Sequence, residues 1–363
     1  MNYKKTKKRH ASLSRTGSIL VLTAFFLLPL MNSCSTRESG SNFGGVEIGA
    51  ITYSWRSMPG GIDNIIKYCK ETGITSLELM SGDLETYLGA PENPIMKLFR
   101  RPPEPPAPQE TTTPPEQQAA SNPEAEPAAR PAPQPRGRFE ITDEMRAEIE
   151  EYNAEIREWR LSLPMSKFEE VKKLFDEEGI SIHIVKFEPA RWSDEEIDYA
   201  FEAAKAMGAK GVSDEISEES VRRLAPFAEK HDMYAVFHNH MQFAQEGFTY
   251  DTFVDISPNV MFNFDAGHFF GSTGRHPNEI IEKYHDRIFS IHLKDKTGPD
   301  TDPANTNQVW GQGQVPVEDV LHLVQDNKWP IYCDIELEYD VKPWSDAVKE
   351  VRTCVRYARQ ILI

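Results

Sequence analysis

Residues 177–186 read EEGISIHIVK, so a charged, helix-like segment stops at Gly179 and a short apolar run begins directly after it. A glycine just past the end of a helix relieves the left-handed cap conformation. The apolar run suits a parallel strand that is buried on both faces. The same order of features recurs at Gly73 and Gly208. These stretches predict a repeated unit in which helices and strands alternate.

Eight such apolar runs are spaced along the chain, and a helical pattern follows each of them. The runs are Val46–Ile51, Ser76–Met80, Ser181–Lys186, Gly211–Ser213, Tyr234–His238, Val260–Asp265, Ile288–His292 and Ile331–Glu336. Ser193 and Glu196 form a capping-box start for one helix, and residues 345–362 form the closing helix.

This count predicts an α/β fold, a single-domain (β/α)8 TIM barrel. Eight units in about 285 residues match the usual size of that fold. The rival is an open, doubly wound sheet. It is disfavoured because residues 54–57, which follow the first strand, lack the glycine-rich turn of dinucleotide-binding sheets.

The first 34 residues fall outside the barrel pattern. Lysines and an arginine within residues 4–9 precede a short apolar run at residues 19–30, which is too short to span a membrane and suits a signal-peptide core. The run ends at Cys34 in a sequence that resembles the lipobox of bacterial lipoproteins. We expect an exported protein, in the periplasm or outer membrane, that is lipidated on Cys34 and tethered by residues 35–44. The alternative is an ordinary secretory signal with an incidental cysteine.

A second segment interrupts the barrel. Residues 102–135 hold 12 prolines in 34 positions and show no apolar periodicity. Such a composition cannot bury enough surface to offset chain entropy, so we expect a disordered insert over residues 100–140. A highly charged helix is predicted directly after it, at residues 145–160. The barrel domain accordingly spans residues 45–363 with this interruption.

Charge and cysteine content restrict the partners. A net charge of −17 repels phosphate backbones, so nucleic acid is a poor partner. Cys69, Cys333 and Cys354 are widely spaced and lie in apolar patterns, which indicates buried thiols and no cysteine metal site.

Side chains with metal-binding chemistry end the last five predicted strands. Active sites of such barrels lie where the strands end, at the C-terminal mouth. The strand ends carry Asp214 and Glu215, His238 and His240, Asp265 and His268, His292 to Asp295, and Glu336 to Glu338. Imidazole and carboxylate groups that converge there suit Mn²⁺, Zn²⁺, Mg²⁺ or Co²⁺. We expect one divalent ion on Asp265, His292 and Glu336. Any one histidine taken alone could equally have a hydrogen-bonded structural role.

The same residues resemble the xylose isomerase-like barrel superfamily, which includes sugar phosphate isomerases and epimerases, inosose dehydratases and endonuclease IV-like proteins. The motifs that carry the resemblance are Asp265-x-x-His268, Ile291 to Asp295, and Ile335-Glu336-x-Glu338. The resemblance extends from Val46 to the C-terminus, without the insert. Its motifs are fairly specific for the superfamily and weak for any one reaction.

The resemblance also implies roles for individual residues. It makes the aspartate, histidine and glutamate of the last three strands the metal ligands, as the strand ends already suggest. It implies that His268 faces substrate or metal and that Lys294 touches substrate. The glycine loop at residues 310–313 would close over the site.

One position departs from the family pattern. Many epimerases of the group end the fifth strand with a glutamate that is both ligand and base, whereas this chain has His238. The paired-glutamate mechanism therefore does not carry over intact. Glu215, at the end of the fourth strand, is either the missing carboxylate ligand or a helix N-terminal charge. The fourth metal ligand is thus either Glu215 or His238.

Other candidates rest on position alone. Trp55 and Arg56 follow the first strand and either contact a sugar ring or belong to a packed loop. His240 is a candidate for substrate binding. Lys186 ends the third strand, and Glu78 lies within the second, where it is a candidate to point into the barrel.

Together these features favour a metal-dependent sugar isomerase, epimerase or lyase. The metal would polarise a carbonyl so that a base removes the proton from the adjacent carbon, and His238, Glu336 and Lys294 are the catalytic candidates. Export favours a non-phosphorylated sugar or a keto-glycoside as substrate. The alternative is a carbohydrate-binding lipoprotein that kept the barrel without turnover. An endonuclease is disfavoured by the charge and by the expected export.

Overall fold

The computed structural model describes residues 40–94 and 142–363. The predicted signal peptide with Cys34, the first part of the predicted tether and the whole of the proline-rich insert lie outside the described residues. None of the helices in the described ranges is both long and apolar enough to cross a membrane.

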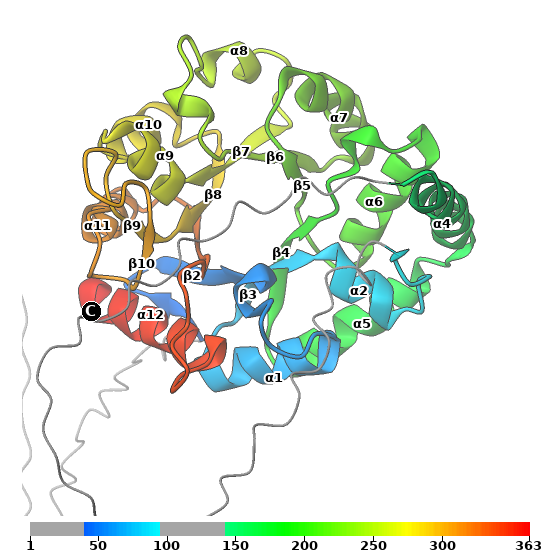
Figure 1. Cartoon of the computed structure of the whole chain (residues 1–363), viewed down its shortest axis with the longest axis horizontal. Helices are drawn as coiled ribbons and strands as arrows, with labels where there is room; N and C mark the ends of the chain where they lie inside the picture. Colours follow the sequence, from blue (N-terminus) through cyan, green and yellow to red (C-terminus); the bar gives the residue numbers. More distant parts are fainter. Residues whose placement is uncertain (1–39, 95–141) are drawn as a thin grey trace, which may run out of the picture. The chain divides into compact units, whose positions relative to one another are not determined.

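Eight parallel strands close into a barrel, and helices surround it (Figure 1). The strands are β2 (Val46–Ile51), β3 (Ser76–Met80), β4 (Ser181–Lys186), β5 (Gly211–Glu215), β6 (Tyr234–His238), β7 (Val260–Asp265), β8 (Ile288–Leu293) and β11 (Tyr332–Ile335). Ala50 of β2 pairs with Leu77 of β3 on one side and with Ile335 of β11 on the other, which closes the ring. The predicted TIM barrel is confirmed, and an open sheet with two free edges is excluded.

The outer layer consists of helices that follow the strands. They are α1 (Ile62–Thr72), α2 (Ser81–Tyr87), α4 (Asp143–Ser162), α5 (Ser166–Glu177), α6 (Asp194–Ala206), α7 (Glu218–His231), α8 (Asp251–Val254), α9 (Ala266–Thr273), α10 (Asn278–Tyr284), α11 (Val317–Asn327) and α12 (Ala347–Leu362). Gly73 caps α1 in the left-handed conformation, at φ 84°, as the sequence predicts. The predicted capping box of Ser193 and Glu196 starts α6.

Part of the predicted tether belongs to the barrel. Asn42–Phe43 forms strand β1, which pairs antiparallel with β2. Phe43 is buried in the core, and the Arg359 guanidinium of α12 lies over its ring. The prediction of a tether up to residue 44 is therefore wrong at its C-terminal end, because one apolar side chain anchors this segment to the barrel.

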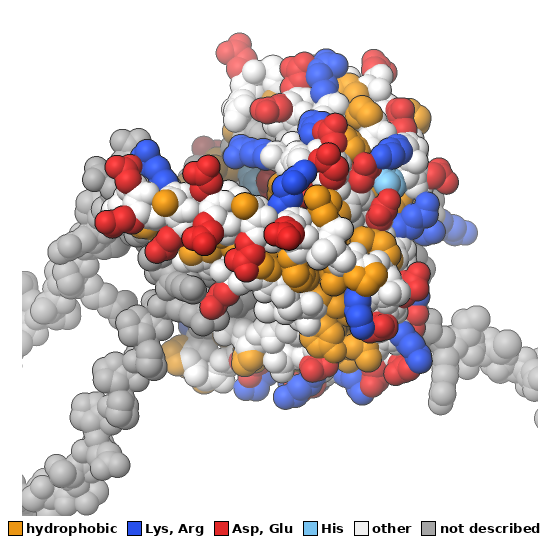
Figure 2. Space-filling view, turned by 90° about the vertical axis from the view of Figure 1, so that its right-hand side faces the viewer, with side chains coloured by type: hydrophobic (Ala, Val, Ile, Leu, Met, Phe, Trp, Pro, Cys, Tyr) orange, Lys and Arg blue, Asp and Glu red, His pale blue; other side chains and the backbone are white. Residues whose placement is uncertain are grey.

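Helix α4 is fixed to the barrel by a buried arginine. Arg160 makes a two-pronged ion pair with Glu85 of α2, at 2.8 and 3.1 Å, and bonds Glu196 of α6 at 3.1 Å. Its guanidinium also lies 3.6 Å from the ring centre of Trp192. The outward surface of α4 is acidic, and Figure 2 shows Asp and Glu side chains gathered on this side of the molecule. Arg160 thus links α2, which precedes the insert, to α4, which follows it.

Candidate metal centre and active site

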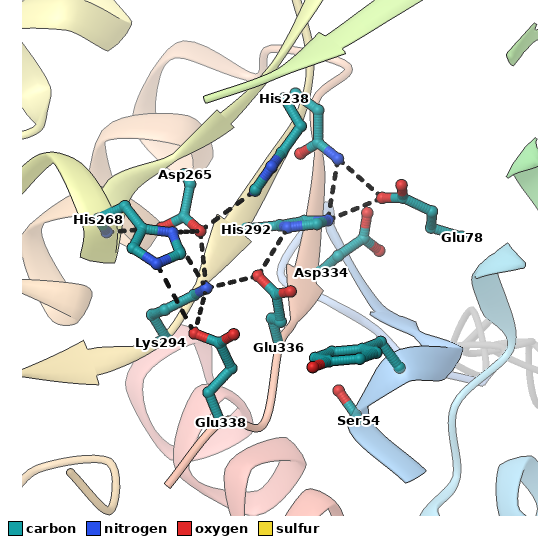
Figure 3. Close-up of polar contacts among 12 residues, drawn as sticks. Ser54, Glu78, His238, Asp265, His268, His292, Lys294, Asp334, Glu336 and Glu338 are labelled. Carbon is teal, nitrogen blue, oxygen red and sulfur yellow. Dashed lines mark hydrogen bonds and ion pairs between the residues drawn. The ribbon is translucent and has the colours of Figure 1, made fainter. Parts of the chain in front are cut away.

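Four buried side chains from consecutive strands converge at the mouth of the barrel (Figure 3). His238 ends β6, Asp265 ends β7, His292 lies in β8 and Glu336 directly follows β11. One ligand atom from each lies within 4.8 Å of the others. The structure brings together the three predicted ligands and His238, which is one of the two predicted options for the fourth.

Asp265 holds its place because it also caps a helix. Its Oδ1 accepts the backbone N–H of His268 at 2.7 Å and so caps α9. The other oxygen, Oδ2, faces Nε2 of His238 at 3.3 Å and Nδ1 of His268 at 2.6 Å. The cap fixes the carboxylate and leaves one oxygen directed at the cluster.

A buried glutamate orients His292 from behind. Oε2 of Glu78 lies 2.7 Å from Nε2 of His292, while Nδ1 of the same ring faces Glu336 at 2.9 Å. Glu78 also accepts hydrogen bonds from Ser213 and Asn263 inside the barrel. Its predicted inward direction is confirmed. This is the carboxylate–histidine arrangement that fixes the ring of a metal-binding histidine.

Glu215 stands in the same relation to His238. Its Oε2 lies 3.3 Å from Nδ1 of His238, on the side of the ring opposite Asp265. Lys186 holds the other oxygen of Glu215 at 2.7 Å. Glu215 thus lies behind the four-residue cluster, where it is placed to orient the ring of His238.

Burial and neighbouring charges shift the pKa values of the side chains at this site in opposite directions. Burial by itself raises the pKa of Glu78, but the imidazole of His292 outweighs it and lowers the pKa to about 2. Burial likewise disfavours the charged form of His238, yet hydrogen bonds to Asp265 and Glu215 raise its pKa. The cluster therefore combines strong donor groups with a dry, low-dielectric setting.

A second group of side chains surrounds Lys294. Its ammonium nitrogen lies 2.7 Å from Asp265, 2.6 Å from Glu336 and 2.8 Å from Glu338. These carboxylates outweigh burial and raise the pKa of Lys294. Burial lowers the pKa of His268; the carboxylate of Asp265 acts against this, and the charge of Lys294 adds to the lowering. Lys294, Glu338 and His268 form a connected set able to donate or accept protons beside the ligand cluster.

The predicted substrate-binding residues separate into two groups. His268 borders the cluster, and half-exposed His240 lies at the rim, where its Nε2 bonds Glu215 at 2.9 Å. Trp55 is buried in the core against the ring of Tyr68, so its predicted contact with a sugar is wrong and the packed-loop alternative describes it. Arg56 donates to the backbone carbonyl of Leu337, which ties the first mouth loop to the last.

The glycine loop after β8 is anchored by an acid. Asp295 accepts backbone N–H bonds from Gly311, Gly313 and Val315 at 2.8–3.1 Å. Trp310 is buried and packs edge-on against Tyr357 of α12. The loop that the family resemblance places over the site is thus held by Asp295 of β9 (Asp295–Lys296) on one side and by the outer helix α12 on the other.

Sequence reasoning assigned no role to Glu338 or Lys296, although both lie at the mouth. Each stands two positions beyond a recognised site residue, Glu336 or Lys294. In an extended segment, residues two positions apart point to the same side. The spacing of two positions from Glu336 and from Lys294 is the sequence feature that could have identified Glu338 and Lys296 as site residues.

The donor set fits a divalent metal. Two imidazoles and two carboxylates on rigid strand ends suit a borderline ion such as Zn²⁺ or Mn²⁺. Two further groups of potential ligands in the described part of the chain, Glu215–His238–His240 and Glu78–His292–Asp334, share a histidine with this cluster. Among these three groups, the four-residue cluster is the one whose members are all buried and all lie at the C-terminal mouth of the barrel.

Comparisons with known proteins agree with this architecture. Inosose dehydratase of Clostridium perfringens is 26% identical over 138 residues, which cover 34% of this chain; the chain spans 46% of the length of that relative. The probable 3-DHS dehydratase AsbF of Bacillus anthracis has a TM-score of 0.51 at 11% identity, covering 86% of this chain and 98% of that one. An IOLI protein with a bound zinc atom also has a TM-score of 0.51, at 12% identity, covering 87% and 98% of the two chains.

Both structural likenesses show the fold alone. The family itself is shown by a match over residues 139–358, which contain the four cluster residues, Lys294 and Glu338. This chain belongs to the xylose isomerase-like TIM barrel family.

Proposed function

We propose that this protein is a divalent-metal-dependent sugar isomerase, epimerase or lyase that removes a proton next to a carbonyl. The observation that carries the proposal is the pairing of two sets at one mouth. Four buried ligands lie beside the Lys294–Glu338–His268 set, and Asp265 and Glu336 contact Lys294 directly. Ligands and proton-handling groups thus share one site, as abstraction from a chelated keto-sugar requires.

His238, Asp265, His292 and Glu336 would hold the ion, which supplies Lewis-acid polarisation of a carbonyl. The chain's own residues do the rest. Glu78 and Glu215 keep the two imidazoles in fixed orientations. His268 accepts a proton, and the Lys294 ammonium donates one, with Glu338 between them at 2.8 Å from Lys294 and 3.9 Å from His268.

Within this class, elimination is favoured over symmetric epimerisation. Epimerisation uses two bases on opposite sides of one carbon. Both nitrogens of His238 are engaged, one with Glu215 and one towards Asp265, so His238 itself offers no free base on that side. The proton-handling groups gather on the other side, around Lys294. The name of the curated relative, a dehydratase, agrees with this preference.

The test combines metal analysis with proton exchange. Purified protein is assayed for bound metal and then incubated with non-phosphorylated keto-sugars and 3-keto-glycosides in D₂O. We expect about one divalent ion per chain and deuterium incorporation or elimination on one substrate class. In Asp265→Ala, most of the metal and the exchange should be lost while the fold remains. Asp251→Ala, a substitution at an exposed ion pair with Lys283, is the matched control.

Two outcomes would decide against the proposal. Full metal occupancy in Asp265→Ala would remove the ligand assignment. Sugar binding by the metal-loaded protein without proton exchange on any sugar would instead favour a non-catalytic carbohydrate-binding protein on the same barrel.

Export as a lipoprotein also belongs to the proposal. It rests on the resemblance of residues 31–34 to a lipobox, which lies outside the described residues. Mass spectrometry of the mature N-terminus should find a diacylated Cys34, and the Cys34→Ser chain should lose the lipid. An unmodified cysteine inside an ordinary cleaved signal would contradict it.

A further inference from the structure

Two lysines two positions apart at the mouth have different surroundings. Lys294 contacts three carboxylates at 2.6–2.8 Å. Lys296 donates one hydrogen bond, to the amide oxygen of Asn307 at 2.8 Å, and forms no ion pair with the acids of the described ranges. A lysine ammonium carries three donors, so Lys296 retains donor capacity.

The uncompensated charge of Lys296 is buried. Its side chain is 4% exposed. Burial, followed by repulsion from Lys294, lowers its pKa, even though Asp265, Glu338 and Glu336 act in the opposite direction. The cation therefore lies within electrostatic range of the site's carboxylates but is not neutralised by them. An anionic partner would stabilise it.

The fold provides dedicated space for both lysines. Gly267 and Gly271 lie one turn apart on α9. A Cβ atom on Gly267 would come within 2.2 Å of Lys294 Cγ, and one on Gly271 within 2.9 Å of Lys296 Cε. Side chains there would displace the lysine stems from the mouth.

A short two-stranded sheet fixes the end of Lys296. Strand β9 (Asp295–Lys296) pairs with β10 (Asn307–Gln308), so Asn307 stands directly opposite Lys296. The amide nitrogen of Asn307 in turn donates to the backbone carbonyl of Glu338 at 3.4 Å. The ammonium is thereby held next to the residue whose side chain contacts Lys294.

We propose that Lys296 binds a carboxylate of the substrate, which makes the substrate class a keto-sugar acid. This inference rests on the proposed function and names its substrate class. A carboxylate fits because a single ammonium with spare donors matches one singly charged group. A phosphate brings more charge and three acceptor oxygens, and usually recruits several cationic or backbone donors.

Equilibrium binding tests the assignment without turnover. The metal-loaded protein is titrated with glucuronate, galacturonate and gluconate, and with their neutral counterparts glucose, galactose and glucitol. We expect tighter binding of the acids. Lys296→Met should weaken the acids at least tenfold and leave the neutral sugars unchanged, while Lys296→Arg should retain part of the preference. Lys349→Met, at an exposed ion pair with Asp346, is the control.

The fold and metal content of each variant are checked by thermal melting and metal analysis, and a folded Lys296→Arg keeps the test valid if Lys296→Met is unstable. Equal affinity for acids and neutral sugars, equal weakening of both by Lys296→Met, or tighter binding of glucose 6-phosphate than of glucuronate would overturn the inference.

The two proposals fail in different ways. Exchange on neutral sugars with no preference for acids removes the role of Lys296 and leaves the proposed function standing. Lys296-dependent binding of acids without any proton exchange supports the Lys296 site and removes the catalytic function.

Discussion

Each of two histidines at the mouth uses one ring nitrogen for a carboxylate of the barrel and presents the other to the cluster. His238 does so through Glu215, and His292 through Glu78. The nitrogen that faces the cluster is Nε2 in His238 and Nδ1 in His292. Because such hydrogen bonds fix both the tautomer and the orientation of the ring, the two glutamates belong to the centre as much as its ligands do.

This arrangement predicts different results for His238 and its partner. We expect His238→Ala to lose metal and turnover together, because a ligand is removed. Glu215→Gln should keep the metal but bind it about 10–100-fold more weakly, the usual scale for a residue that orients a ligand. Metal affinity and turnover are measured side by side, with His276→Ala at the surface as control.

The opposite pattern would reassign His238. If turnover falls by about 10² or more in His238→Ala or His238→Gln while metal stays bound, His238 is an acid–base catalyst. If neither changes, the interpretation of strand β6 is wrong, and Glu215 or His240 is the residue to examine.

Glu78 should make the stability of the metal-free protein depend on pH. A carboxyl group whose pKa falls from 4.5 to about 2 on folding stabilises the protein at pH values above its unfolded pKa. That contribution is lost as the pH falls through about 2. We expect Glu78→Gln to lower the free energy of unfolding at pH 7 by about 3 kcal/mol, and by less towards pH 2. Urea unfolding in chelator between pH 2 and 7 measures this.

Glu169→Gln, on the exposed face of α5, is the control for the effect of a glutamate-to-glutamine substitution as such. A constant difference between wild type and Glu78→Gln across this pH range would contradict the assignment of the low pKa to Glu78.

Single residues show most clearly which features of the site can be predicted from the sequence and which cannot. Asp265, His292 and Glu336 are predictable because they end strands, and strand ends meet at the mouth of a barrel. The burial of Trp55 is not predictable in this way, because it depends on packing against Tyr68 of α1. The role of Glu78 depends on Ser213, Asn263 and His292, which lie 135 or more residues away in the chain. No local pattern reports such contacts.

At the level of elements, the short apolar runs in the sequence predict all eight barrel strands. The packing of helix α4 is not predicted in this way, because it depends on one arginine. Arg160 is buried between Glu85 and Glu196. Removing it would leave two buried carboxylates without their cation, which costs about 3–5 kcal/mol. We expect Arg160→Met to lower the free energy of unfolding by about this amount. Chemical denaturation measures the change.

Arg157 offers a matched control one turn earlier on the same helix. It pairs with Glu195 at the surface, at 3.3 Å, so Arg157→Met should change stability by less than about 1 kcal/mol. Equal effects of the two substitutions would show that α4 is held by other contacts.

At the level of the whole molecule, the barrel should tolerate loss of the proline-rich insert. Its composition predicts that residues 102–135 add nothing to the core. Replacing them with a short Gly/Ser linker should leave the melting temperature nearly unchanged, since Arg160 already joins the flanking helices α2 and α4. A drop of more than about 10 °C, beyond the usual single-site scale, would show that the segment packs against the barrel.

The four-residue cluster can form only after β11 has paired with β2, because these two strands close the barrel. Ser54 bonds both Ile335 and Leu337 at 2.9 Å and so joins the beginning of the barrel to its last strand. Glu336 is the last of the four cluster residues to be synthesised, 98 residues after His238. The nascent chain therefore cannot present all four groups before Glu336 has been made and β11 has paired with β2. An ion that binds all four residues would then be selected from the metals present where folding is completed.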